Sequence, residues 1–237
     1  MKSWTRTLNM DDAHTLLALA RPGMHLDAWA TKCHAALPSL SMPRRRELIR
    51  ILRDGFLLPD GEVIPDGPFL TAYATAPAMA QIDLVHLQWA LSHPLTLVAV
   101  EKLVAPALLS GRPDIPHDEF EDLVSRRLET SSAESLRKTR TVLLAAMEDI
   151  GVIEARGAGA HRLLRACRGR PHPIAFAYLV RRDLHERNLD GMIEREVTET
   201  SLAPRVTQCG PTWARHCLHE ALQEGALRRR DDEIVLP

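Results

Sequence analysis

The 237-residue sequence has few aromatic side chains, which make up only 4% of it, although hydrophobic residues make up 45%. Strands favour aromatic and β-branched residues, so a core rich in Leu and Ala predicts a mostly helical protein. The four cysteines are scattered, and none forms a Cys-x-x-Cys pair. This pattern favours a reducing compartment over a disulfide framework.

Long apolar runs are also missing. Met1 to Met10 contains none, which argues against a secretory signal. The most apolar stretch, Leu84 to Leu109, is interrupted by polar and charged side chains, whereas a bilayer span needs about 20 consecutive apolar residues. We therefore expect a buried helix pair there, and a cytoplasmic protein with no membrane partner.

The sequence also lacks complete catalytic and metal-binding motifs. His185 and His219 are each followed by Glu, but neither stretch has the second His of a zinc protease helix. Gly157-Ala158-Gly159 indicates a tight turn rather than a dinucleotide site, and there is no P-loop or nucleophile elbow. Asp118 to Asp122 suits the start of a helix without a metal. We expect a non-enzymatic protein with no catalytic residues, metal or cofactor.

One small pattern occurs at three places in the chain. A helix with apolar residues one turn apart ends at a Gly, which favours a left-handed C-cap, and a short apolar–polar stretch follows. A β-hairpin is expected after the first and third of these helices, as in a winged helix-turn-helix; ordinary helices ending at Gly remain the alternative. The three glycines are Gly55, Gly151 and Gly225.

The rest of the chain predicts helices. Asn9 with Asp12 caps one running to about residue 20, Pro116 opens another, and Ser131-x-x-Glu134 is a capping box for a long helix ending near Ile150. Further helices are expected near 27–37, 78–92, 95–109, 173–188, 190–200 and 211–224. The turn at 65–68 separates two expected domains, 1–66 and 67–237, the second with a winged-helix-like end. The predicted class is all-α with small β-hairpins following helices.

Charge is unevenly distributed, although the net charge is only −1. Residues 155–182 contain seven arginines and no acid. Elsewhere, Arg46, Arg50 and Arg53 follow helical spacing and form a stripe. On the helix after Ser131 the outward side chains near the start are basic or hydroxylic. The candidate DNA-binding residues are Arg44, Arg45, Arg46, Arg50, Arg53, Arg137, Lys138, Arg140, Thr141, Arg168 and Arg170.

Side chains of these types contact phosphates, so the pattern predicts binding to duplex DNA mainly through its backbone. The sequence offers no convincing set of base-reading side chains, which predicts little sequence preference. Two alternatives stay open. In the first, the chain is an interaction or adaptor module whose arginines pair with acids of a protein partner. In the second, the basic helices bind RNA.

Residues 77–154 resemble the BrxA family of BREX phage-defence systems. The resemblance rests on Leu87-Gln88-Trp89-Ala90-Leu91-Ser92-His93-Pro94-Leu95, on Asp118-x-Phe120, and on Ser132-x-x-Ser135-x-x-Lys138-x-Arg140-x-x-Leu143 running into residues 146–153. Residues 43–53 fit more loosely, and the region beyond Ala155 matches less well. The resemblance implies a helical protein without known catalytic activity that binds DNA and works beside a methyltransferase and other defence components.

Overall fold

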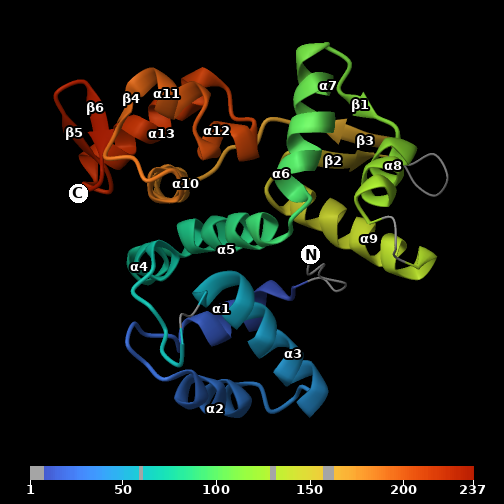
Figure 1. Ribbon diagram of the computed structural model, residues 1–237, viewed down its shortest axis with the longest axis vertical. Helices are drawn as coiled ribbons and strands as arrows, with labels where there is room; N and C mark the ends of the chain where they lie inside the picture. Colours follow the sequence, from blue (N-terminus) through green and yellow to red (C-terminus); the bar gives the residue numbers. More distant parts are fainter. Residues whose placement is uncertain (1–7, 59–60, 129–131, 157–162) are drawn as a thin grey trace. The chain divides into compact units, whose positions relative to one another are not determined.

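The computed structural model describes residues 8–58, 61–128, 132–156 and 163–237, which are predominantly helical with small antiparallel sheets (Figure 1). The helical class expected from composition is confirmed. The described residues form two compact units, Leu8–Ser92 and His93–Pro237. This division differs from the expected one at 66/67, because the helices after residue 67 pack onto the N-terminal ones.

The N-terminal unit is built from helices whose ends agree with the sequence signals. The Asn9 side chain caps the first helix by accepting the Asp12 N–H, as expected. Trp29 is fully buried and donates to the Leu16 carbonyl at 3.2 Å, and Gln88 donates to the Gly55 carbonyl across the unit. Its elements are α1 (Met10–Leu17), α2 (Leu26–Ala36), α3 (Met42–Leu52), the π-helical turn η1 (Arg53–Leu57), α4 (Pro68–Thr75) and α5 (Ala78–Ser92).

The prediction of a hairpin after α3 is wrong. Phe56 and Leu57 continue the helix as η1 and are buried, with the Phe56 ring 5.4 Å from that of Phe69. Val63 makes an antiparallel bridge with His25 instead. Residues 59 and 60 of the expected turn lie outside the described chain. Burial of two adjacent apolar side chains holds this segment helical where the sequence suggested a strand.

The second unit begins with a middle module, α6 to β3. Its helical stretch α6 (Thr96–Ala99), η2 (Val100–Val104) and α7 (Ala105–Leu109) was expected as one helix over 95–109. The hairpin after the second Gly is present, and Gly151 takes a φ of 71°. The sheet order is β1-β3-β2, all antiparallel. The remaining elements are β1 (Asp114–Ile115), α8 (His117–Arg127), α9 (Ala133–Asp149), β2 (Ile153–Arg156) and β3 (Leu163–Ala166).

The start of α9 differs by one residue from the predicted capping box. Ser132, not Ser131, is the N-cap, and its hydroxyl accepts the Ser135 N–H at 3.3 Å. Ser131 itself lies outside the described residues. The hydroxyl satisfies one of the N–H groups that a helix start leaves without an intrahelical partner.

We expect Ser132→Ala to lower the free energy of unfolding by about 1 kcal/mol, because an N-terminal N–H of α9 loses its acceptor. Urea titration followed by circular dichroism measures the change. Thr141→Ala on the exposed face of the same helix is the control, expected within about 0.5 kcal/mol of the unchanged chain. Equal effects of the two substitutions would contradict the capping role.

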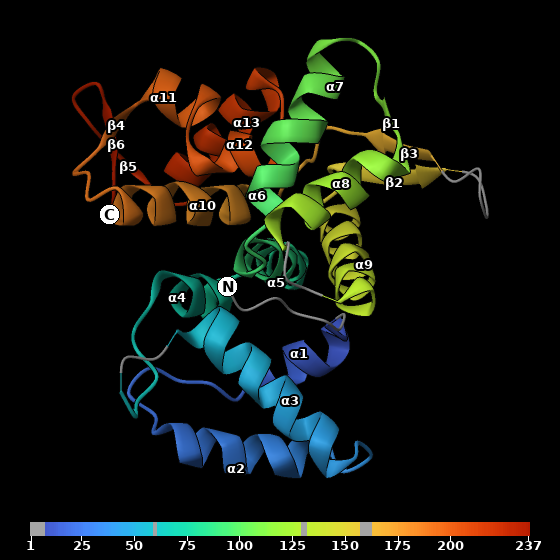
Figure 2. The same ribbon diagram turned by 45° about the vertical axis from the view of Figure 1, so that its right-hand side comes forward.

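The C-terminal module, α10 to β6, repeats the pattern (Figures 1 and 2). The hairpin expected after the third Gly is present, with Gly225 at a φ of 71° and Asp231 at its tip at 55°. Buried Asp183 accepts the Leu202 N–H at 2.8 Å and so ties α12 to α10. The elements are α10 (Pro173–Glu186), β4 (Met192–Ile193), α11 (Glu194–Glu199), α12 (Leu202–Thr207), α13 (Pro211–Gln223), β5 (Arg228–Arg230) and β6 (Glu233–Val235).

Both modules of the second unit share one chain order. A helix is followed by a short strand, then by helices, and finally by a hairpin whose last strand pairs with the first one. The sheet orders β1-β3-β2 and β4-β6-β5 are therefore equivalent. The N-terminal unit has a similar chain order, because His25 before α2 pairs with Val63 after α3 and η1. By this order α3, α9 and α13 occupy corresponding positions.

Candidate nucleic-acid interface

The basic stripe expected on α3 is exposed. Arg46, Arg50 and Arg53 are accessible, whereas Leu48, Ile51 and Leu52 are buried on the opposite face. The Arg53 guanidinium lies 2.7 Å from the Asp54 carboxylate, which neutralises part of the stripe at its C-terminal end. The stripe therefore presents less positive charge at its C-terminal end.

Arg44 and Arg45 are placed differently from the stripe. Both are half-buried; Arg44 pairs with Glu47 at 3.0 Å, and Arg45 donates to the His34 carbonyl at the end of α2 at 2.6 Å. The Arg45 guanidinium thus joins α3 to α2, whereas the Arg44 ion pair lies within α3. Phosphate contacts from them would require breaking those bonds.

The basic start of α9 is partly neutralised by its own module. Arg140 is half-buried and pairs with Glu121 of α8, and Lys138 pairs with Glu134 one turn earlier. Arg137 is exposed and forms no ion pair within the described part of the chain. Thr141 is also exposed, and its hydroxyl donates to the Arg137 carbonyl at 3.0 Å. Exposed pairs such as Lys138–Glu134 open at little cost, so α9 keeps a modest basic face.

Helix α13 presents a polar face that sequence reasoning missed. Buried Ala214, Cys217, Leu218 and Ala221 line one side of the helix. The exposed side chains recur at intervals of three and four residues and thus share the other side. They are Thr212, Arg215, His216, His219 and Gln223. The sequence predicted this helix but treated His219 only as part of a failed metal motif.

Two of the predicted arginines lie at the start of α13. Arg168 is exposed and its guanidinium is 3.4 Å from the Gln208 carbonyl, just before the helix. Arg170 is also exposed and stacks 5.8 Å above the ring of Trp213. The Trp213 indole N–H donates to the Pro171 carbonyl at 3.2 Å, which fixes the ring. Both arginines thus stand beside the polar face.

The β5–β6 hairpin adds further cations. Arg228, Arg229 and Arg230 are all exposed. Arg229 pairs with Glu194 of α11 at 2.6 Å, and Arg230 is 3.7 Å from Glu233. Arg228 forms no ion pair with any described residue. The hairpin also exposes three acids, Asp231, Asp232 and Glu233, so its net charge is balanced and only the position of Arg228 favours a phosphate contact.

The remaining arginines of the 155–182 block do not form one surface. Arg156 pairs with Glu154 on the same strand, and Arg182 is half-buried and pairs with Glu186. Arg165 is half-buried in β3. Arg162 and the 157–159 turn lie outside the described residues. The acid-free stretch therefore spreads over a strand pair, a connection and α10.

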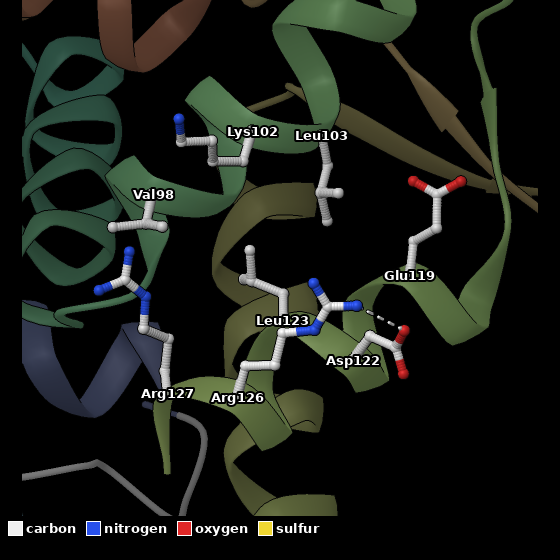
Figure 3. Close-up of a pocket in the computed structure, with 8 residues that line it drawn as sticks. All are labelled: Val98, Lys102, Leu103, Glu119, Asp122, Leu123, Arg126 and Arg127. Carbon is white, nitrogen blue, oxygen red and sulfur yellow. Dashed lines mark hydrogen bonds and ion pairs between the residues drawn. The ribbon is translucent and has the colours of Figure 1, made fainter. Parts of the chain in front are cut away.

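A groove of about 400 Å³ lies between α6–η2 and α8 of the middle module (Figure 3). Its walls carry charge of both signs: Lys102 and Arg127 on one hand, Glu119 and the Asp122–Arg126 ion pair on the other. The expected acidic run thus lies in the first turns of α8, as a helix start favours. Mixed charge does not suit a polyanion.

Within the described ranges, no three His, Cys, Asp or Glu side chains are grouped so that they would hold a metal ion. No single helix in that part of the chain is long and apolar enough to cross a membrane. Only α5 and the α6–α7 stretch taken together reach the length and apolar composition of a span, and they are bent by 89° where they meet. No known protein family, curated protein or solved structure matches the chain.

Proposed function

We propose that this chain is a non-enzymatic protein that binds duplex DNA mainly through phosphates. The observation that carries the proposal is the exposed, acid-poor face of α13 with Arg168 and Arg170 beside its start. The proposal is also supported by the chain order of helix, strand, helices and hairpin, with the first strand paired to the last, which is the order expected for a winged helix. In helix-turn-helix proteins the later helix enters the major groove.

Local charge has to supply the attraction, because a net charge of −1 gives no long-range pull toward a polyanion. Arg46 and Arg50 on α3, Arg137 on α9, and Arg168 and Arg170 beside α13 are exposed. Each belongs to, or adjoins, a helix at the corresponding position of the repeated order. Exposed Arg side chains are the usual phosphate contacts.

We further propose that the protein belongs to a BREX-like antiphage defence system in the bacterial cytoplasm, where a methyltransferase and other defence proteins are its partners. This proposal is supported by the resemblance of residues 77–154 to the BrxA family. The matching stretches fall on α5, α8, α9 and β2, which are regular elements with buried apolar faces.

Salt titration tests the DNA-binding proposal. We expect fluorescence anisotropy with a labelled duplex of arbitrary sequence to give a log–log salt slope of about −4 or steeper, since each phosphate contact contributes about −0.9. Absent binding, or binding unchanged between about 50 and 200 mM salt, would contradict it and favour a protein-docking adaptor. Tighter binding to double-stranded RNA than to DNA would instead favour the RNA alternative.

A further inference from the structure

We propose that α13 reads base edges in the major groove, so that the chain prefers particular duplex sequences. This inference rests on the proposed DNA binding and deepens it: phosphates supply most of the affinity, and one helix supplies the preference. It departs from the sequence-based expectation of little preference, which rested on clustered basic side chains and gave the polar side chains of α13 no role.

The chemistry of the α13 face suits base readout. Arg215 can donate two parallel bonds to guanine O6 and N7. Gln223 can accept a bond from the adenine N6 amino group and donate one to adenine N7. Thr212, His216 and His219 carry short or planar polar groups that reach base edges. Thr212 and His219 are seven residues apart, which spans about 10 Å of helix axis, or about three base-pair steps.

These side chains are also available. Arg215 is exposed and forms no ion pair with the described residues, among which the Gln223 amide is bonded only to the His219 ring, at 2.9 Å. The opposite side of α13 is buried, with Ala214, Cys217 and Ala221 fully so. A helix fixed on one side and free on the other holds its polar groups in place before binding, which reduces the entropy lost on contact.

Flanking cations would position the helix. Arg168 and Arg170 stand at its start, and Arg228 lies on the hairpin that follows it. Trp213 is held by its indole hydrogen bond and by Arg170, so the first turn of α13 is fixed to the segment that carries these arginines. Phosphate contacts on both sides of a groove set the register in which base contacts form.

The corresponding helix α9 lacks such a face. Lys138 is paired with Glu134, and Arg140 is half-buried against Glu121. Two of the three basic side chains at the start of α9 are therefore engaged within their own module. Among the corresponding helices of the second unit, α13 is therefore the one equipped for readout.

Selection from a pool of randomised duplexes with the full chain tests the inference. We expect an enriched sequence that binds about tenfold or more tightly than a shuffled duplex at the same salt concentration, which is the scale of one bidentate contact. Arg215→Lys keeps the charge but loses the forked donor pair. It should abolish most of that preference while leaving the salt slope unchanged.

Two further variants make the test independent of one substitution. His219→Ala should also reduce the preference, because it removes the imidazole and its bond to the Gln223 amide while Ala is well tolerated at an exposed helix position. Arg195→Lys on the exposed face of α11 is the matched control and should change neither preference nor slope. Thermal melting checks that all variants fold.

The outcomes separate the two proposals. Absence of binding to any duplex overturns the proposed function and this inference together. Salt-dependent binding without an enriched sequence overturns only the inference, as does a preference that survives both Arg215→Lys and His219→Ala. Loss of the preference with an unchanged slope supports it.

Discussion

Replacing Arg46, Arg50 and Arg53 of α3 together by Gln is expected to weaken duplex binding by about a hundredfold at about 0.1 M salt. Each lost phosphate contact flattens the log–log salt slope by about 0.9. Because Arg53 is already paired with Asp54, the triple substitution should remove about two units rather than three. Anisotropy titrations across salt measure both quantities.

The control compares single charges in the same unit. Arg46→Gln should flatten the log–log salt slope by about 0.9. Replacing exposed Lys32 of α2 by Gln should leave this slope unchanged. Both positions are exposed on helices, so each change should alter the free energy of unfolding by only a few tenths of a kcal/mol. Equal slopes for the two single variants would mean that binding senses total charge and not the α3 stripe.

Much of the helical framework could be predicted because its determinants are local. Asn9 before α1, Pro116 before α8 and the spacing of buried residues on α9 and α13 all act within a few residues. The hairpin after Gly225 was predicted from the same kind of short-range signal, whereas the hairpin after Gly151 was not expected. The hairpin predicted after Gly55 is absent because Phe56 packs against Phe69 as part of the helical turn η1. No local sequence pattern encodes this contact.

The candidate interface was less accessible to sequence reasoning because ion pairs depend on distant partners. Arg45 bonds to the His34 carbonyl and Arg140 pairs with Glu121, and neither separation is a helical spacing. The face of α13 was missed for another reason. A search for clustered charge gives little weight to Thr212, His216 and His219, although their three- and four-residue intervals place them on one side of a helix.

Acid is expected to destabilise this protein strongly through His93. The side chain is 2% exposed, its Nδ1 accepts the Leu95 N–H, and its Nε2 has no hydrogen-bond partner among the described residues. Burial lowers the pKa of His93 from its ordinary 6.5 to about 4. The folded chain therefore keeps the ring neutral at a pH where the unfolded chain protonates it.

The stabilisation from neutral His93 is full above pH 6.5 and is lost as the pH falls toward 4. At about 1.4 kcal/mol per pKa unit, the loss reaches about 3 kcal/mol. His93→Asn keeps an acceptor for Leu95 but cannot titrate, so it should be less stable at pH 7 by an amount that shrinks by about 3 kcal/mol by pH 4. Exposed His185→Asn should show no such convergence. Urea unfolding across this range measures the gap, and a gap independent of pH would mean that the His93 ring takes up its proton in the folded chain as readily as in the unfolded one.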